Sequence, residues 1–151
     1  MSPKPIIVPT DFSEHSAAAL GWARRMSALL DTPIHCVYVM SEASVYSGME
    51  FIPAAYPSME EIRKGAEAEL VRFIAKHDLG SEPTGVVLTG APFVEIIRYA
   101  RAQDAAMIIM STHGYGGLKH VLLGSTTAAV VRKASCPVLS IPALDGEFEM
   151  P

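Results

Sequence analysis

The groups that could do chemistry gather most densely in the segment MSTHGYGGLKHVLLGST, residues 110–126. Three glycines fall within residues 114–117, and seven positions after the last of them comes Gly124, followed by Ser125 and Thr126. Glycine permits positive φ and lets the backbone approach a ligand closely. A glycine that opens a helix exposes backbone N–H groups, and the positive end of the helix dipole favours phosphate there. The pattern indicates a phosphate-binding site; the alternative is a surface loop followed by an ordinary serine-capped helix.

Asp11 is a second candidate, in the segment PTDFS that follows an apolar run. Its carboxylate can accept hydrogen bonds from an amine or from the hydroxyls of a ligand. The alternative is a turn or capping aspartate, although Ser13 is already available to cap a helix. Near the glycine-rich segment, Lys119, His113 and His120 either supply positive charge to a ligand or lie on the surface in contact with water.

Five short apolar runs rich in β-branched residues must position these groups. Continuous apolar runs without alternation are typical of strands buried on both faces of a parallel sheet. Asp11 follows the first run and the glycine-rich segment follows the fourth. The expected strands cover residues 5–9, 34–40, 84–88, 106–111 and 137–141.

Four helical patterns alternate with these strands. Ser13 is expected to cap the first, and Ser58 with Glu61 forms a capping box for the second, which ends at Gly80. Pro92 suits the first turn of the third helix. The first helix covers residues 14–30 and the fourth about 125–133; the inward residues are expected to be Ile62, Ala66, Leu70, Phe73 and His77 in the second and Val94, Ile97 and Ala100 in the third.

The strict alternation of strands and helices predicts an α/β fold. We expect one domain over residues 1–151, with a five-stranded parallel sheet, helices on both faces and a Rossmann-like arrangement. Ligands of such sheets bind outside the carboxyl ends of the strands, at the point where the strand order reverses. Both candidate segments follow strands at those ends.

Composition excludes several classes of protein. Half of the residues are hydrophobic and 19% are charged, against about 25% in typical domains, which excludes a disordered chain. The net charge is −4, from 12 basic and 16 acidic residues, and no basic stripe is visible, so we expect no nucleic-acid partner. Such a chain has either a large core or apolar surface that a partner covers.

Targeting and metal signals are also lacking in the sequence. No apolar run approaches the roughly 20 residues of a membrane span, and the start turns polar too soon for a signal peptide. We therefore expect no membrane association, a cytoplasmic location, and buried reduced thiols at Cys36 and Cys136. There is no zinc spacing, GxSxG elbow or GxxxxGK[ST] loop. The long stretch 41–57 is predicted to be a lid or binding loop, or else a partly disordered excursion.

Over nearly its whole length the chain resembles the universal stress proteins. The resemblance is carried by the segments IIVPTDFSEHSAAAL, CVYVM and TGAPFVEIIRYARAQDAAMIIMSTHGYGGLKHVLLGSTTAAVVRKASCPVLSIP, in this order and spacing. It implies a five-stranded parallel α/β sheet and a homodimer in which the last strand, residues 138–141, pairs with its copy. Members of this family divide into those that bind ATP and those that do not.

The ATP-binding members carry the motif G-x2-G-x9-G-[ST]. In this chain Gly114 is the second glycine and Gly124 with Ser125 closes the motif, while Ser111 stands in place of the first glycine. The Cβ of Ser111 would crowd a ligand if that position required positive φ. By resemblance, the adenine-nucleotide site comprises Pro9, Thr10, Asp11 and Val39 around the adenosine, Met110 and Ser111 beside the base and ribose, and His113, Gly114, Gly124, Ser125 and Thr126 near the phosphates.

These features favour a regulatory protein of the stress response that binds ATP, with or without Mg²⁺. Two alternatives remain at this point. One is a slow ATP hydrolase, in which His113, Lys119 and His120 lie near the phosphates; Asp11 is the one obvious carboxylate for a metal. The other is a protein-interaction module with an empty site, which Ser111 would suggest.

Overall fold

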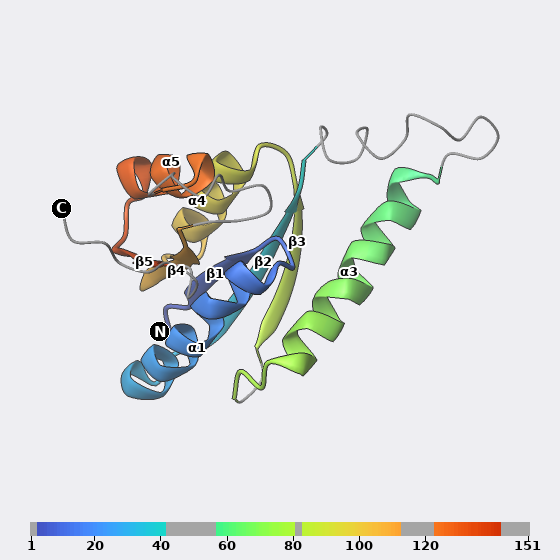
Figure 1. Cartoon of the computed structure of the whole chain (residues 1–151). Coiled ribbons are helices and arrows are strands. Elements are labelled where there is room, and N and C mark those ends of the chain that lie inside the picture. The colour runs from blue at the N-terminus through green and yellow to red at the C-terminus, as the bar shows by residue number, and fades with distance from the viewer. Residues whose placement is uncertain (1–2, 42–56, 81–82, 113–122, 143–151) are drawn as a thin grey trace.

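Figure 1 shows the computed structural model of the chain, which describes residues 3–41, 57–80, 83–112 and 123–142. Strands and helices alternate along these residues as expected. The strands are β1 (Ile6–Thr10), β2 (Ile34–Met40), β3 (Thr84–Thr89), β4 (Met107–Ser111) and β5 (Val138–Ile141). The helices are α1 (Glu14–Leu30), α3 (Met59–Lys76), α4 (Pro92–Ala102) and α5 (Ser125–Lys133).

The strands form one parallel sheet in the order β3-β2-β1-β4-β5. The central strand β1 pairs with β2 on one side, where Ile6 lies opposite Ile34, and with β4 on the other, where it lies opposite Met107. The chain order reverses between β1 and β4, so the switch point lies at their carboxyl ends. The prediction of a five-stranded parallel sheet is confirmed.

Helices cover both faces of the sheet (Figure 1). On one face Ile6 and Val8 of β1 share a buried cluster with residues of α1 and α3, and α3 itself lies against β2 and β3. On the other face Ile7 shares a second buried cluster with residues of α4 and α5. These three β1 residues are all 0% exposed, which explains why the run has no polar alternation.

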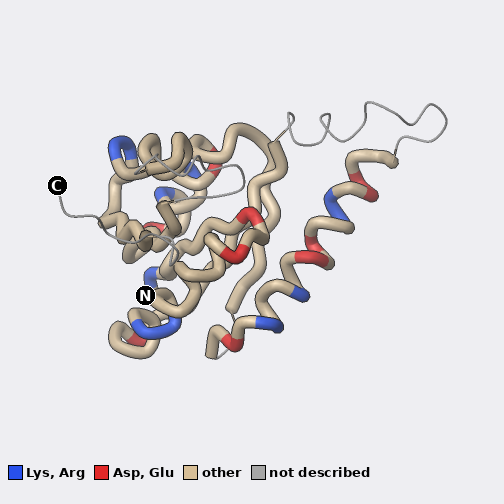
Figure 2. Tube along the Cα trace, viewed as in Figure 1, with Lys and Arg blue, Asp and Glu red and all other residues tan. Residues whose placement is uncertain are grey.

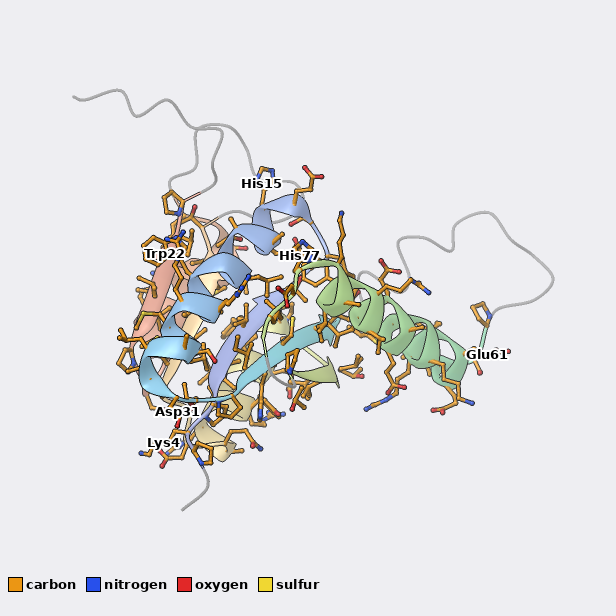
Figure 3. The ribbon with its side chains drawn as sticks, turned by 90° about the horizontal axis from the view of Figure 1, so that it is seen from below. Lys4, His15, Trp22, Asp31, Glu61 and His77 are labelled. Atoms are coloured by element: carbon orange, nitrogen blue, oxygen red, sulfur yellow. The ribbon has the colours of Figure 1, made fainter. Side chains whose placement is uncertain are left out.

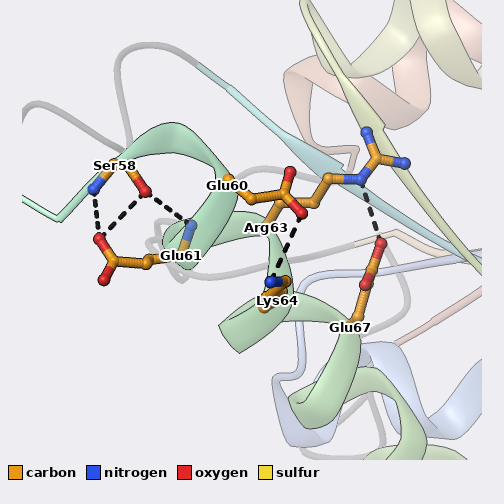
Figure 4. A network of polar contacts seen from close by, with 6 residues as sticks. All are labelled: Ser58, Glu60, Glu61, Arg63, Lys64 and Glu67. Carbon is orange, nitrogen blue, oxygen red and sulfur yellow. Dashed lines mark hydrogen bonds and ion pairs between the residues drawn. The ribbon is translucent and has the colours of Figure 1, made fainter.

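The predicted helix starts are confirmed. The Ser13 hydroxyl accepts from the Ser16 N–H at the start of α1. At the start of α3, Ser58 and Glu61 form the predicted capping box (Figure 4). These side-chain acceptors satisfy N–H groups that the helix itself leaves without partners. The hydrogen bonds from Ser58 lower the pKa of the Glu61 carboxyl below its ordinary value.

Two details of the helices differ from expectation. Helix α3 ends at Lys76, ahead of Gly80, because the chain already turns into the left-handed region at Asp78, with φ 41°. In α4 the buried side chains are those of Ile96 and Ala100, while Val94 lies half-buried. Counting from the helix start at Pro92, Ile96 rather than Val94 lies one turn before Ala100 on the same face.

Helix α3 also protects an edge of the sheet. Figure 2 shows acidic and basic residues alternating along it, and Arg63 forms an ion pair with Glu67 one turn later. The Arg63 guanidinium also donates to the backbone carbonyl of Val87, at 3.3 Å. The Gly90 N–H donates to the Met40 carbonyl of β2. Backbone groups alternate in direction along a strand, so the Val87 carbonyl points away from β2, towards the open side of the edge strand β3.

Cys36 and Cys136 are both free thiols, as expected. Cys36 is fully buried in β2, and burial raises the pKa of its thiol to about 12. Cys136 lies only half-buried just before β5, and burial raises the pKa of its thiol too. Among the described residues, no helix is both long and apolar enough to cross a membrane.

Two leucines of α1 test the packing of this helix on the sheet. Leu20 is 1% exposed and Leu29 is 76% exposed. We expect Leu20→Ala to lower the free energy of unfolding by about 2–5 kcal/mol, because it leaves a cavity. The control Leu29→Ala makes the same chemical change on the outer side and should alter it by less than about 0.5 kcal/mol. Urea denaturation measures both; equal losses would contradict the burial of α1.

Candidate functional site

Pro9 ends the pairing of β1 with β4. The Ile6 N–H donates to the Pro33 carbonyl at the start of β2, and the Pro5 carbonyl accepts from Ala106, on the β4 side. Backbone groups alternate along a strand, so the backbone nitrogen of Pro9 faces β4, and proline has no N–H to donate. Pairing with β4 accordingly covers Ile6 and Ile7 alone, while pairing with β2 continues to Thr10.

The carboxyl end of β4 is tied to α5 instead. The N–H of Thr112 donates to Ile141 of β5, so the carbonyl of Ser111, one residue earlier, faces the β1 side. There it accepts from the hydroxyl of Thr127 at 2.9 Å. The buried side chain of Thr127 thus supplies the donor that β1 no longer offers.

Asp11 begins the turn that leads from β1 to α1. Its Oδ1 accepts hydrogen bonds from both the backbone N–H and the hydroxyl of Ser13. Asp11 is therefore the turn aspartate of the alternative interpretation, and it also lies at the strand end where a ligand is expected. A carboxylate can accept about four hydrogen bonds, so the turn does not exhaust its capacity.

The hydroxyl groups of Thr10, Ser13 and Ser16 form hydrogen bonds that support this turn. The hydroxyl of Thr10 lies 2.9 Å from that of Ser16 and accepts from the backbone N–H of Phe12. The Ser16 hydroxyl donates to the carbonyl of Ser13. Thr10, Ser13 and Ser16 are all buried, and because each has a partner, no desolvation cost is left uncompensated.

Phe12, between Asp11 and Ser13, has a φ of 65°. A bulky residue in the left-handed region costs roughly 1–2 kcal/mol. The Phe12 ring packs on that of Tyr38 in β2, with ring centroids 4.4 Å apart. Burial raises the pKa of the Tyr38 phenol, and the negative charge of Asp11 raises it further. Nothing in the sequence signalled this conformation, because aromatic residues rarely adopt it.

Ser111 is the last residue of β4 and is 7% exposed. Its φ is negative, since among the described residues other than glycine positive φ occurs at Phe12, Asp31, Asp78 and Asp104. A Cβ at position 111 therefore brings no backbone strain. Ser111 was expected to crowd a ligand only if its position required positive φ, and this condition is not met.

Gly124 caps α5 with φ −61° and ψ 155°, and no side chain caps this helix. The serine-capped helix of the alternative interpretation is wrong, because Ser125 is already inside the helix. The Gly124 N–H donates to the Thr112 carbonyl at 2.7 Å, and a Cβ added to Gly124 would lie 3.1 Å from that carbonyl. Glycine is used here for close approach and not for positive φ.

Helix α5 has a polarity that suits an anion at its start. Its first turn contains no acidic residue, and its last turn holds Arg132 and Lys133. The N–H groups of a first helical turn have no partners within the helix, and the dipole places partial positive charge there. Thr112 and Gly124 join this helix start directly to the end of β4.

The structure brings most of the predicted residues to the carboxyl ends of the strands. Pro9, Thr10 and Asp11 lie at the end of β1, Val39 lies near the end of β2, Met110 and Ser111 end β4, and Gly124, Ser125 and Thr126 begin α5. His113 and Gly114 lie outside the described residues, as do Lys119, His120 and most of the stretch 41–57. In the described part of the chain, no three His, Cys, Asp or Glu side chains gather to hold a metal ion.

Comparison with known proteins gives consistent matches. The family model described as the universal stress protein family matches residues 3–142. Universal stress protein MJ0531 of Methanocaldococcus jannaschii is 30% identical over 140 residues, which cover 91% of this chain and 81% of that protein. The solved structure of hypothetical protein MJ0577 has a TM-score of 0.79 at 28% identity and covers 97% of this chain and 100% of its own.

Two more distant structures share the fold. One is a universal stress protein in complex with cAMP, with a TM-score of 0.67 at 18% identity over 94% of this chain and 98% of its own. The other is the universal stress protein from Archaeoglobus fulgidus in complex with dAMP, with a TM-score of 0.67 at 22% identity over 93% and 98%. At these identities the likeness concerns the fold.

The contact between Gly124 and Thr112 can be tested with two glycine variants. We expect Gly124→Ala to lower the free energy of unfolding by about 1 kcal/mol, because the methyl group presses on a backbone carbonyl and alanine is a poor helix cap. Gly21→Ala is the control: it lies within α1 with no atom within 4 Å of an added Cβ. That change should raise stability by about 0.5–1 kcal/mol. A stabilised Gly124→Ala protein would refute the close approach.

Proposed function

The chain belongs to the universal stress protein family, and we propose that it binds ATP at the carboxyl ends of β1 and β4 as a regulatory protein of the stress response. The observation that carries the proposal is the meeting of two unlike groups at the switch point. A carboxylate, Asp11, follows β1, and the start of α5, which no side chain caps, is joined to the end of β4. One accepts hydrogen bonds and the other donates them.

The adenosine part of the ligand suits the β1 side. The Asp11 carboxylate accepts hydrogen bonds from ribose hydroxyls or an exocyclic amine, and charge-assisted bonds of this kind are the stronger ones. Pro9 and Met110 would flank the ligand, with Val39 of β2 against the base. Since β1 and β4 stop pairing at Pro9, strand pairing does not join their carboxyl ends at the place proposed for the ligand.

The phosphates suit the start of α5. Backbone N–H groups of Ser125 and Thr126 and their hydroxyls would donate to phosphate oxygens, with the helix dipole adding attraction. The absence of a Cβ at Gly124 lets the start of α5 lie against the Thr112 carbonyl at the end of β4. The phosphates give the ligand its negative charge, and any Mg²⁺ bound to them reduces that charge. The overall charge of −4 does not oppose binding. Backbone donors would contact the phosphate directly, whereas salt largely screens the repulsion from distant surface charges.

The known complexes agree with an adenine nucleotide. Structures of the same fold hold dAMP in the protein from Archaeoglobus fulgidus and cAMP in another universal stress protein. Both ligands consist of an adenine nucleoside with one phosphate, which the two ends of the proposed site match. ATP is the ligand that the motif ending at Gly124 and Ser125 favours.

Ligand binding is tested by thermal unfolding and calorimetry. We expect millimolar ATP to raise the melting temperature, since free ligand at a hundred times its Kd stabilises the folded state by about 2.7 kcal/mol. Asp11→Asn keeps a turn-forming side chain but removes the charge, and should raise the Kd about tenfold or more. Asp31→Asn, at the far end of α1 in a left-handed conformation, is the control and should leave the Kd unchanged. If ATP gives no shift with the unaltered protein, the proposed function is wrong.

We further propose that the protein is a homodimer through β5. This strand forms one edge of the sheet. The Pro137 and Ile141 carbonyls accept from β4, so Val138 and Ser140 direct their backbone groups outward by alternation. Leu139 is 36% exposed beside them. An unprotected edge of this kind readily pairs with another strand.

Dimerisation through β5 is tested with Ser140→Pro. Proline removes an outward N–H and leaves the ladder to β4 intact, so the folded monomer should survive while the dimer dissociates at least tenfold more readily. Sedimentation equilibrium measures the dissociation constant. Ser140→Ala is the control and should behave as the unaltered chain. A Ser140→Pro protein that remains dimeric would exclude β5 pairing.

A further inference from the structure

Phe12 has a backbone conformation that its residue type does not favour. Its φ is 65°, while the other described non-glycine residues with positive φ, Asp31, Asp78 and Asp104, are all aspartates. Aspartate tolerates this region because its short side chain can bond locally, whereas a bulky aromatic residue does not. Such a conformation persists where the surrounding structure enforces it, and it occurs most often at functional sites.

Contacts from two further elements hold Phe12 in place. Its ring lies on that of Tyr38 in β2, at 4.4 Å between centroids and 31° between planes. It meets the ring of Phe73 in α3 edge to face, at 5.7 Å and 69°. Its backbone N–H donates to Thr10 at 2.9 Å. Phe73 is 7% exposed and is itself packed against His77 at 4.6 Å.

The conformation of Phe12 sets the geometry of Asp11. The Asp11 carboxylate accepts from Ser13, two residues on, and Phe12 is the residue between them. Rotation about the Phe12 backbone to negative φ would carry the Ser13 N–H away from Asp11 Oδ1. The carboxylate would then lose one of the donors that orient it. Stacking of the Phe12 ring therefore fixes the direction in which the carboxylate points.

We propose that Phe12 is a positioning residue for the ligand-binding carboxylate of Asp11, and that its ring, held between Tyr38 and Phe73, makes ligand affinity depend on the seating of α3. For the ligand, this rests on the proposed nucleotide function. The link to α3 is direct, because Phe73 belongs to that helix. In Figure 3 the end of α3 marked by His77 lies close to the start of α1, whereas the end marked by Glu61 projects away from the sheet.

A double-mutant cycle measures whether Phe12 acts through Asp11. Kd for ATP is determined by calorimetry in the unaltered protein, Phe12→Leu, Asp11→Asn and the double variant. We expect Phe12→Leu to raise the Kd about tenfold in the presence of Asp11 and less than twofold in the Asp11→Asn background, because groups that act as a unit are not additive. Phe12→Tyr keeps the ring and should stay within about twofold of the unaltered Kd. An equal loss in both backgrounds would overturn the proposal.

A second cycle needs no ligand and uses Tyr38 as the reporter. The charge of Asp11 raises the pKa of the Tyr38 phenol, so Asp11→Asn should lower that pKa. The titration is followed by NMR of ¹³Cζ-labelled tyrosine, with Tyr38→Phe to assign the signal. If Phe12 positions Asp11, the effect of Asp11→Asn on the Tyr38 pKa shrinks by at least half in Phe12→Leu. An undiminished effect would refute the positioning role.

The two cycles separate this inference from the proposed function. If ATP does not bind the unaltered protein, the nucleotide proposal fails and the Tyr38 titration alone decides the role of Phe12. Far-UV circular dichroism confirms that each variant is folded. If Phe12→Leu does not fold, Phe73→Leu replaces it, because it removes the edge contact from outside the turn. The same non-additivity with Asp11→Asn is then expected, and additivity would overturn the link to α3.

Discussion

The arrangement of the candidate site depends on a hydrogen bond that cannot form. Pro9 has no N–H to give to β4, and from that residue on the central strand holds β2 alone. Each strand end must then find other partners. Thr127 bonds to the Ser111 carbonyl, Thr112 binds the start of α5, and the β1 end bonds to its own turn through Thr10. The separation of the two ends, and the identity of the groups on each, follow from this one interruption.

The two halves of the site obtain their polarity from different sources. On the β1 side it is the charge of one side chain, Asp11, kept in place by hydroxyl groups that are themselves buried. On the β4 side it is the backbone of α5, which Gly124 places against the end of β4 and whose first turn has no acidic residue to compete. A phosphate bound as proposed would need neither a basic surface nor an arginine, so the acidic composition does not oppose the proposal.

The fold was predictable because local signals and burial agree. Strand runs without polar alternation matched strands covered on both faces, and Ser13, Ser58 and Pro92 marked helix starts by their own chemistry. The left-handed Phe12 was not predictable, since rings distant in sequence impose it against local preference. The position of Gly124 at a helix start was predictable from the sequence. Its close contact with the Thr112 carbonyl was not, because that contact depends on how the end of β4 packs against the start of α5. Helix α3 ended earlier than expected, because the chain already turns left-handed at Asp78, two residues before Gly80, which is left-handed as well.

The two edges of the sheet are treated differently. At β3 the Arg63 guanidinium from α3 occupies the outward carbonyl of Val87, while no comparable side chain of the described residues is seen on β5. A sheet with two open edges can add strands at both and extend without limit. In the homodimer proposed above, pairing of β5 with its own copy would use this edge in both partners, while the Arg63 contact on β3 would oppose addition at the other edge. Growth of such an assembly would stop at two chains.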